Sequence, residues 1–410
     1  MWYLHRPDRI KRYIENNKRN EERIRNKGKI NVIFFASNIS MWHYQGLYEE
    51  MVKCPRFTPY IVLSPLSSYT IEQKRKHINE LRSFFDKKKT GYIDYDTDKM
   101  KGYNIKKLSP DILFYPQPYY TVMCKEHRYY KFNKCLLAYY PYFFHRTNLD
   151  FEYNEDFHNR AWRLYYETKF QKKDAKLRAA VGDLNVRIVG YPNADEFKKE
   201  PVDVWKPQKR KKKRIIWAPH FTISNDGWVQ SGNFLWMADF IVQLAEEYKD
   251  TIQIAFKPHP RLLTELYKHP EWGKYKTDEY YKKWEKLDNG QLETNGYIDL
   301  FMTSDAMIHD SGSFGVEYQY TLKPVIFVSN DINAYLKTIS EFGHKVYDLH
   351  YIAKSKEDIL NFIDNIVIKG ADVMYNKRCK FVNDYLFPPN NLSVAKNTMN
   401  DILRSLSPNQ

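Results

Sequence analysis

The sequence is poor in cysteine and has no long apolar run. Its four cysteines form no CxxC pair, which predicts neither a zinc site nor a disulfide framework: Cys54, Cys124, Cys135 and Cys379. We therefore expect reduced thiols in a cytosolic protein. No segment approaches about 18 consecutive apolar residues, so we expect no transmembrane helix. The first residues lack an apolar stretch of signal length, and no secretory signal peptide is expected.

Several signatures of common enzyme classes are also missing. There is no GxxxxGK[ST] phosphate loop, no kinase signature, no GxSxG elbow and no DxD metal motif. We accordingly predict neither a metal ion nor a cofactor. Helix-turn-helix, zinc-finger and RRM signatures are absent too, which argues against a nucleic-acid partner.

Positive charge is abundant, with a net charge of +15. It is concentrated in residues 1–29, which hold ten Lys or Arg and four Asp or Glu, and in the unbroken run 209–214. Such segments are either solvated surface or attracted to anionic groups, for example those of the cytoplasmic leaflet of a membrane. We predict a cytoplasmic protein that is peripheral to the inner face of the cell membrane. Residues 1–29 are interpreted as a basic helical arm, either interfacial or a plain surface arm.

Apolar, strand-like segments alternate with helical ones along the chain, and 43% of the residues are apolar. This alternation predicts parallel sheets and an α/β fold with two Rossmann-like domains that face a cleft. Residues 155–180 are expected to be helical. The expected strands are 31–36, 60–63, 110–115, 136–139 and 186–190, then 214–218, 252–256, 306–309 and 325–327.

The domain boundaries follow from composition. A polar stretch with Pro201 and Pro207 leads into the basic run and is typical of a linker. After it the strand and helix pattern restarts. The expected parts are a basic helical arm (1–29), an N-terminal Rossmann-like domain (30–195), a basic linker (196–214), a C-terminal Rossmann-like domain (215–385) and a C-terminal helix (386–410).

Three expected strand ends of the second domain carry polar residues. His220 follows one strand, Lys257-Pro258-His259-Pro260 follows another, and Asp310-Ser311-Gly312-Ser313 leads a third strand into a helix. Ligands of open α/β sheets bind beyond the carboxyl ends of the strands, and free N–H groups at a helix start bind anions. We predict an anion site there, with Glu317 placed to bind ribose hydroxyls. Ordinary helix capping and an incidental surface histidine are the alternatives.

The first domain offers loops that are aromatic and polar together. Trp42, His43 and Tyr44 follow its first strand, and Gln117 and Tyr142 follow later ones. Binding pockets commonly have this composition. It is an equal alternative that the aromatic residues of each segment simply pack in the hydrophobic core and bind no ligand.

In combination, these segments resemble the CDP-glycerol glycerophosphotransferase family, the teichoic-acid primase and polymerase type. The resemblance covers roughly residues 30–400. It rests on a KPHP turn at 257–260, an SDxxIxDxxSxxxEY pattern from Ser304 to Tyr318, a KPxIF strand at 323–327, and the segments 217–220, 189–192 and 32–59.

The resemblance implies a GT-B-like fold whose C-terminal domain holds the nucleotide-activated donor and whose N-terminal domain holds the acceptor. It implies transfer of a polyol phosphate, glycerol phosphate first, to a glycan or lipid-linked acceptor in cell-surface polymer biosynthesis. His220 and His259 would act on the donor phosphates, and His43, or else His145, would be the base. One departure concerns the WHGTPLK segment of polymerase-type members, because the corresponding region here reads Tyr140-Pro141-Tyr142-Phe143 and lacks its histidine.

Two other functions remain open on the sequence alone. A glycosyltransferase that uses a nucleotide sugar would hold its donor phosphates with the same C-terminal residues. A non-enzymatic membrane or nucleic-acid adaptor would use the basic surface instead.

Overall fold

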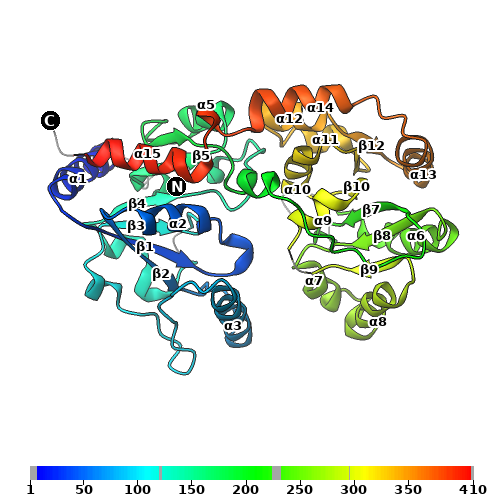
Figure 1. The fold of residues 1–410 in the computed structure, drawn as a ribbon, viewed down its shortest axis with the longest axis horizontal. Coiled ribbons are helices and arrows are strands. Elements are labelled where there is room, and N and C mark those ends of the chain that lie inside the picture. Colours follow the sequence, from blue (N-terminus) through cyan, green and yellow to red (C-terminus); the bar gives the residue numbers. More distant parts are fainter. Residues whose placement is uncertain (1–6, 120–121, 224–231, 295, 408–410) are drawn as a thin grey trace. The chain divides into compact units, whose positions relative to one another are not determined.

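The chain forms two compact units in a computed structural model, which describes residues 7–119, 122–223, 232–294 and 296–407. The N-terminal unit comprises residues 1–145, 149–195 and 386–410, and the C-terminal unit comprises 146–148 and 196–385. Each unit contains a parallel six-stranded sheet flanked by helices (Figure 1). The predicted α/β class is confirmed.

The sheet of the N-terminal unit has the order β2-β1-β3-β4-β5-β6. Its inner strands β1, β3 and β4 are almost wholly apolar and buried on both faces, as is usual for parallel sheets covered by helices. The strands are β1 (Ile30–Ala36), β2 (Phe57–Leu63), β3 (Ile112–Tyr115), β4 (Leu136–Tyr139), β5 (Arg163–Tyr166) and β6 (Val186–Ile188). The helices between them are α2 (Gln45–Lys53), α3 (Ile71–Lys87), α4 (Asp156–Arg160) and α5 (Lys169–Arg178).

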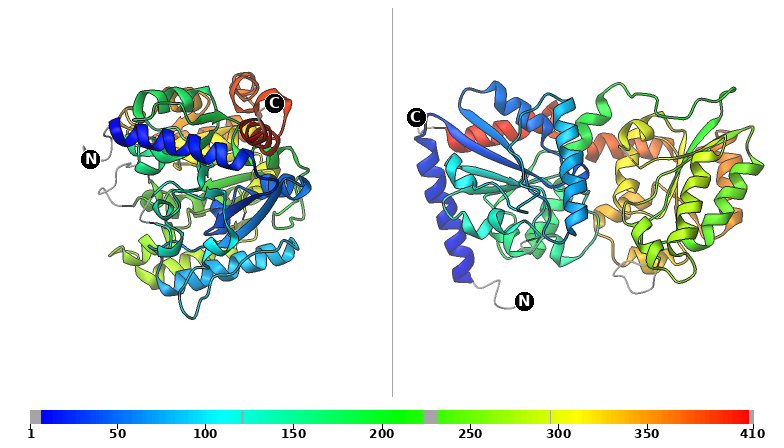
Figure 2. Two further views of the ribbon diagram at one scale, coloured as in Figure 1. Left: turned by 90° about the vertical axis from the view of Figure 1, so that its left-hand side faces the viewer. Right: turned by 90° about the horizontal axis from the view of Figure 1, so that it is seen from below.

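Helices from both ends of the sequence complete this unit. Helix α1 (Pro7–Arg25) and helix α15 (Val394–Leu406) lie side by side, and α15 also packs on α2 (Figures 1 and 2). Helix α1 buries Ile10 and Ile24, and Lys27 beyond it pairs with the buried Asp111 carboxylate at 2.7 Å. One face of the basic N-terminal helix is therefore engaged by its own unit. The first six residues of the chain, which precede α1, lie outside the described part.

The sheet of the C-terminal unit has the order β12-β11-β10-β7-β8-β9. Its strands are β7 (Lys213–Ala218), β8 (Ile252–Phe256), β9 (Gly290–Leu292), β10 (Ala306–His309), β11 (Val325–Val328) and β12 (Tyr351–Ala353). Its helices are α6 (Phe234–Glu247), α7 (Leu262–Lys268), α8 (Gly273–Lys286), α9 (Ile298–Thr303), α10 (Ser313–Glu317), α11 (Ile332–Leu336), α12 (Glu341–Tyr347), α13 (Lys356–Asn361) and α14 (Tyr375–Phe381). The chain runs outward from β7 to β9 and then returns to β10 on the other side of β7, so the order reverses there.

Some expected elements differ from the structure. The segment 155–180 contains strand β5 between α4 and α5, because Leu164-Tyr165-Tyr166 is a short buried strand between two helical stretches. Strands β9 and β12 were not predicted, since three residues are too few to show a pattern. Helix α10 is only five residues long and continues as a 3₁₀ turn, Tyr318–Thr321. Within the described ranges, no helix is both long and apolar enough to cross a membrane.

Candidate functional site

The candidate site of the C-terminal unit lies where three neighbouring strands end. Strands β10, β7 and β8 are adjacent in the sheet, and they deliver the Ser311 loop, His220 and His259 to the same edge. The strand order reverses between β7 and β10, and such a switch point is where open α/β sheets bind ligands. The structure thus brings the predicted C-terminal residues together.

The Asp310 side chain connects two segments at this edge of the sheet. Its carboxylate accepts the backbone N–H of His220 at 2.6 Å through one oxygen and that of Asn233 at 2.5 Å through the other. The side chain is buried, and burial raises the pKa of Asp310 to about 6. Asp310 therefore fixes the loop after β7 and the start of α6, rather than leaving its oxygens open to a ligand. Residues 224–231 of this loop lie outside the described part of the chain.

Two imidazoles face one another at the site. The ring centroids of His220 and His259 are 5.3 Å apart. The Phe221 ring contacts both imidazoles, and the Arg261 guanidinium lies over the Phe221 ring. The Nδ1 atom of His259 accepts the backbone N–H of Arg261 at 3.1 Å, and that of His220 lies 3.4 Å from the backbone N–H of Thr222. The His259 ring then carries its proton on Nε2. His220 Nδ1 also lies 3.0 Å from the Thr222 hydroxyl, and as a neutral imidazole His220 likewise carries one N–H donor.

Both imidazoles are uncharged at neutral pH. Burial, reinforced by the neighbouring His259 and by Arg146 and Arg261, lowers the pKa of His220 to about 3. Burial and Arg261 lower the pKa of His259 to about 4. The pair therefore offers N–H donors in a site with cationic neighbours, which suits an anion.

The remaining predicted residues line the same edge. Burial lowers the pKa of Lys257 to about 8, and the Glu293 carboxylate opposes that shift. Ser311 is buried and its hydroxyl has no partner among the described residues, while Gly312 and Ser313 are half-buried. Glu317 is buried and accepts a hydrogen bond from the Tyr297 hydroxyl.

Arg146 is the main site residue that the sequence did not reveal. Any side chain at position 312 would overlap its guanidinium, so Arg146 lies directly against Gly312. The segment 146–148 belongs to the C-terminal unit, where Thr147 bridges to Ile339 and the Arg146 carbonyl accepts the N–H of Ser340 at 2.9 Å. No sequence motif indicates that residues 146–148 belong to the C-terminal unit.

A second buried pair of imidazoles supports the Ser311 loop. His309 donates Nδ1–H to the Ser311 carbonyl at 2.9 Å, and His350 donates to the Val346 carbonyl at the same distance. Their rings lie 5.2 Å apart, and an added Cβ at Gly315 would meet both. Burial lowers the pKa of His350 to about 4 and that of His309 further. Neither histidine was predicted as a site residue. His309 ends β10 at a position that the Ser304–Tyr318 pattern leaves open, and His350 precedes β12 without a motif.

Trp42 and Tyr44 are core residues of the N-terminal unit. The Tyr44 hydroxyl donates to the Tyr115 carbonyl and accepts the Tyr140 N–H at 3.1 Å. The Trp42 indole donates to Gln45 at 3.0 Å and packs edge-on against Phe85. Their polar atoms are satisfied within the fold.

The other predicted residues of this unit lie in loops at the carboxyl edge of its sheet. His43 Nδ1 lies 2.7 Å from the Asn193 amide oxygen, and burial lowers the pKa of His43. Gln117 is buried with no partner for its amide nitrogen among the described residues. Tyr142 is half-buried and hydrogen-bonded to Tyr119, and burial raises its pKa to about 12.

Comparison with known proteins gives one family match. Residues 169–402, more than half of the chain, match the model of the family described as CDP-glycerol:poly(glycerophosphate) glycerophosphotransferase. No curated protein sequence matches the chain.

Solved structures resemble the whole chain at low sequence identity. The H444N variant of the wall teichoic acid polymerase TagF is 13% identical, with 97% of each chain covered and a TM-score of 0.56. S. aureus MnaA in a co-structure with UDP is 15% identical over 93% of this chain and 97% of that one, with a TM-score of 0.58. UDP-GlcNAc 2-epimerase from Neisseria meningitidis, bound to UDP-GlcNAc, is 13% identical over 92% and 99%, with a TM-score of 0.54. These likenesses concern the fold, and they confirm the GT-B-like expectation.

Proposed function

The chain belongs to the CDP-glycerol:poly(glycerophosphate) glycerophosphotransferase family, and from this premise we propose that it transfers glycerol phosphate from CDP-glycerol to a glycan or lipid-linked acceptor. The polymer would be a cell-surface one, such as teichoic acid or capsule. The family match favours this transferase over the glycosyltransferase and the adaptor. The C-terminal unit would be the nucleotide-donor domain and the N-terminal unit the acceptor domain.

The donor diphosphate would be held by uncharged N–H donors together with cations. His220 and His259 would each donate an N–H to phosphate oxygens, while Arg146 and Lys257 would supply positive charge. Ser311, Gly312 and Ser313 would approach the phosphates with hydroxyl and backbone groups. Glu317, held by Tyr297, would face the ribose hydroxyls, and Asp310 would position the loops rather than touch the donor.

The reaction is a substitution at phosphorus. The acceptor hydroxyl oxygen attacks the phosphorus that carries glycerol, forming a new P–O bond. The bond from that phosphorus to the bridging oxygen breaks, and CMP leaves with the electron pair. Such transfers depend on in-line positioning and on stabilisation of the charge that develops on the leaving oxygens. The two histidines and Arg146 are suited to that task.

The N-terminal unit would supply the acceptor contacts and the base. Gln117 and Tyr142 lie in loops at the carboxyl edge of its sheet, and Trp42 and Tyr44 would support them from the core. His43 would take the proton of the acceptor hydroxyl, with His145 as the alternative.

The observation that carries the proposal is the convergence of His220, His259 and Arg146 at one sheet edge. We expect CDP-glycerol to bind and to release CMP when an acceptor is present, because the edge is built for a nucleoside diphosphate. Calorimetry and nucleotide release should be measured with a panel of CDP-polyols and UDP-sugars. Turnover of a UDP-sugar with none of CDP-glycerol would contradict the proposal and favour a glycosyltransferase.

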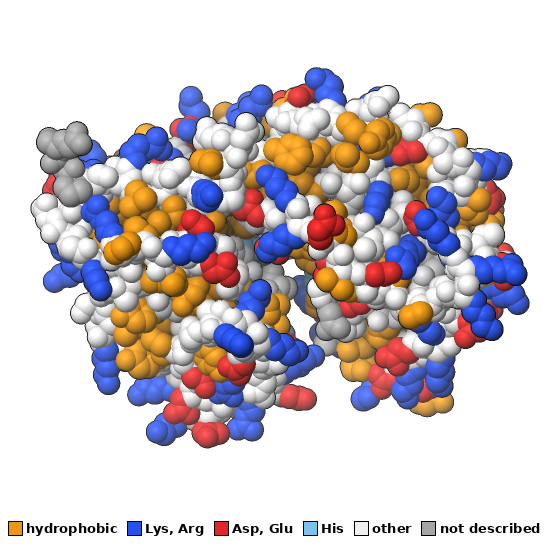
Figure 3. Space-filling view, in the orientation of Figure 1, with side chains coloured by type: hydrophobic (Ala, Val, Ile, Leu, Met, Phe, Trp, Pro, Cys, Tyr) orange, Lys and Arg blue, Asp and Glu red, His pale blue; other side chains and the backbone are white. Residues whose placement is uncertain are grey.

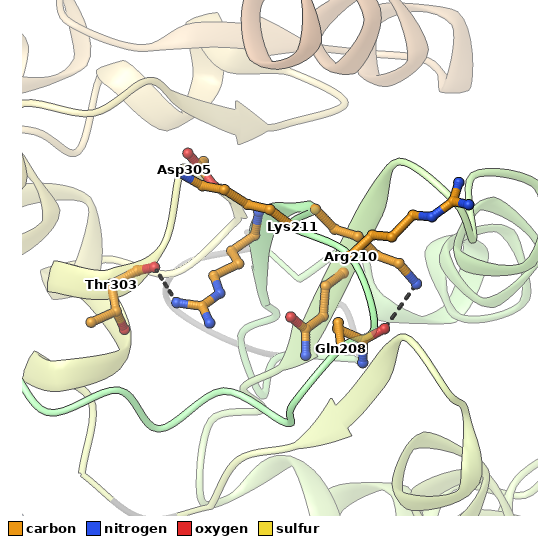
Figure 4. A pocket seen from close by; sticks show the side chains of 8 residues that line it. Gln208, Arg210, Lys211, Thr303 and Asp305 are labelled. Atoms are coloured by element: carbon orange, nitrogen blue, oxygen red, sulfur yellow. Dashed lines mark hydrogen bonds between the residues drawn. The ribbon is translucent and has the colours of Figure 1, made fainter.

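The basic run of the C-terminal unit would attach the protein to the membrane. Gln208, Arg210, Lys211, Thr303 and Asp305, labelled in Figure 4, line one pocket of this unit. The volume of this pocket is about 540 Å³. The nearby acids are already paired, Asp305 with Lys213 at 3.8 Å and Asp203 with Arg214 at 2.8 Å. Elsewhere on the face seen in Figure 3, basic and acidic side chains are interspersed.

Exposed apolar side chains accompany these cations. Val202 is 65% exposed and Val204 38% exposed, a few residues before the exposed Lys209, Arg210 and Lys211. Basic and apolar groups together suit an anionic lipid surface. We place the enzyme in the cytoplasm at the inner face of the membrane on this ground.

Replacing Lys209, Arg210 and Lys211 by alanine should weaken vesicle binding. Each cation contributes about 1 kcal/mol at an anionic membrane, so the loss should be roughly 100-fold or more. Co-sedimentation with phosphatidylcholine vesicles containing phosphatidylglycerol measures it. The matched control replaces Lys274, Lys276 and Lys282 on α8, which removes the same charge elsewhere. Equal losses in both triple variants, or none in either, would contradict the assignment.

A further inference from the structure

Five polar atoms in the N-terminal unit are buried and have no hydrogen-bond partner among the described residues. They belong to what we call the Glu152 cluster: the phenol oxygens of Tyr139, Tyr153 and Tyr166, Glu152 Oε2 and His158 Nε2. Buried polar groups in folded proteins are almost always paired, so a group of five requires an explanation. Tyr139 and Tyr166 end β4 and β5, Glu152 and Tyr153 precede α4, and His158 lies within α4.

The members of the Glu152 cluster lie close together. The rings of Tyr153 and Tyr166 are 6.1 Å apart, and those of Tyr139 and His158 are 6.4 Å apart. Burial first, then the carboxylates of Glu167 and Glu152, hold the pKa of Tyr166 well above its usual value. The phenols therefore keep their protons and act as hydrogen-bond donors.

The half-buried residues Tyr119 and Tyr142 extend this set toward solvent. Their hydroxyls are hydrogen-bonded to one another, and both lie within electrostatic reach of Glu152. Tyr142 is one of the residues that the sequence singled out. The cluster is thus continuous with a loop already expected to bind a ligand.

The protonation states of the cluster residues determine which ligand groups can hydrogen-bond to them. His158 Nδ1 accepts the backbone N–H of Glu155 at 3.1 Å, so its unpartnered Nε2 carries the proton. The cluster then offers one N–H donor, three phenols and a carboxylate oxygen. Hydroxyl groups, which both donate and accept, match this set. An anion does not, because Glu152 and the nearby Glu167 are carboxylates.

A buried histidine–carboxylate pair lies beside the cluster. Glu167 Oε1 is 3.0 Å from His145 Nδ1 and also accepts the backbone N–H of His145 at 3.0 Å. Gln171 donates to the His145 carbonyl at 2.7 Å, so the residue is fixed at both ends. The His145 ring lies 5.2 Å from Tyr153 and 5.1 Å from Tyr166, centroid to centroid.

We propose that the Glu152 cluster is the acceptor subsite, that it takes an uncharged, hydroxyl-rich group such as a sugar or polyol, and that His145, oriented by Glu167, is the base. This inference rests on the proposed transferase function. The proton of the attacking hydroxyl moves to His145 Nε2 as the new P–O bond forms, and the Glu167 carboxylate pairs with the imidazolium on its Nδ1 side. The ligand hydroxyls pair with the phenols, Glu152 and His158.

His145 is better built for this role than His43. The partner of His43 Nδ1 is the neutral amide of Asn193, whereas that of His145 is a carboxylate, which stabilises the imidazolium formed on proton transfer. Burial disfavours that cation, yet Glu167, with Glu152 and Asp174 beyond it, raises the pKa of His145 above its ordinary value. Among the described residues, the charged or titratable groups facing His145 are these three carboxylates, His158 and the phenols of Tyr153 and Tyr166.

The first test replaces His145 by glutamine. With CDP-glycerol as donor and an octyl glycoside as acceptor, we expect CMP release at saturation to fall about 10²–10⁴-fold, the usual worth of a general base. His127→Gln is the matched control, since it removes another buried imidazole of the same unit, and turnover should persist. His43→Gln tests the competing base. A large loss in His43→Gln with near-normal turnover in His145→Gln would overturn the assignment.

The pH dependence of turnover distinguishes a base from a structural residue. If His145 were only structural, its pKa would not appear in the profile. The base must be neutral, so turnover should rise with pH through the raised pKa of His145. Glu167→Gln removes the carboxylate that raises this pKa, so the rise should move to lower pH while the plateau falls. An unchanged profile would overturn the role of the pair, and circular dichroism checks that the variant is folded.

The subsite itself is tested by acceptor kinetics. Tyr166→Phe and Glu152→Gln should each raise the KM for the octyl glycoside about tenfold or more and leave the KM for CDP-glycerol unchanged, since each deletes one polar contact. Glycerol 3-phosphate, the charged probe, should be a poor acceptor. Unchanged acceptor KM values would mean that the cluster holds interior water only, which overturns the inference.

If the proposed transferase function were wrong, the experiments would give a different result from the one expected if only the subsite were wrong. In that case the wild-type chain would release no CMP from CDP-glycerol with any acceptor. Saturation-transfer NMR with the octyl glycoside would still report on the subsite, because it needs no turnover. Loss of the signal in Tyr166→Phe and Glu152→Gln supports the subsite, and an unchanged signal or none in the wild type contradicts it.

Discussion

The His259→Ala variant should lose transfer activity while keeping its fold. His259 is an uncharged N–H donor at the end of β8, beside His220 and the Arg261 guanidinium. Removing one preorganised donor from the developing charge on a leaving group costs about 10²–10³ in turnover. CMP release from CDP-glycerol at saturating acceptor measures the effect. Stability should change little, because the side chain is half-buried and its intramolecular bond is to a backbone N–H at the surface.

His344→Ala is the control for this experiment. His344 is an exposed residue of α12 in the same unit, and its replacement should leave turnover intact. Both variants should melt within a few degrees of the wild type. Near wild-type turnover in His259→Ala would remove His259 from the donor site.

The Asp401→Ala variant should be strongly destabilised. The Asp401 carboxylate is 3.1 Å from the Arg163 guanidinium, 3.3 Å from that of Arg187, and accepts the Tyr165 hydroxyl at 3.1 Å. Its removal leaves the part-buried guanidiniums of Arg163 and Arg187 and the buried Tyr165 phenol without their common partner. Breaking a buried pair in this way costs about 3–5 kcal/mol, which is a large part of the stability of a typical domain. Urea unfolding followed by circular dichroism measures the loss.

Glu50→Ala serves as the matched control. Glu50 pairs with Lys53 one turn along α2 at 3.0 Å, in the same unit but at the surface, and exposed pairs contribute little. Its unfolding midpoint should stay near that of the wild type. Similar midpoints for the Asp401 and Glu50 variants would show that the Asp401 network is not what secures α15.

The donor edge could be anticipated because its information is local. His259 sits in a Lys-Pro-His-Pro turn after an apolar strand, and His220 and Ser311 follow strands of the same kind. Parallel strands present their carboxyl ends at one edge, so residues far apart in sequence converge there. For His220, His259 and Ser311 to lie together, it is enough that β10, β7 and β8 are adjacent strands of one parallel sheet.

Other features depend on contacts that leave no local pattern. Arg146 reaches Gly312 because a three-residue segment joins the other unit, and nothing in its composition signals this. The aromatic loops of the N-terminal unit were ambiguous for a physical reason. Tyr44 and Tyr166 look alike in sequence, yet the hydroxyl of Tyr44 is used by the backbone while that of Tyr166 has no partner in the described structure.

The interleaving of the units has a consequence for biosynthesis. The N-terminal unit needs α15, whose Asp401 and Thr398 complete contacts of Arg163 and Tyr140. During translation these residues leave the ribosome after the whole of 196–385. All six strands of the N-terminal unit are then already made, but the contacts of Arg163 and Tyr140 with α15 can form only after the C-terminal unit has been synthesised.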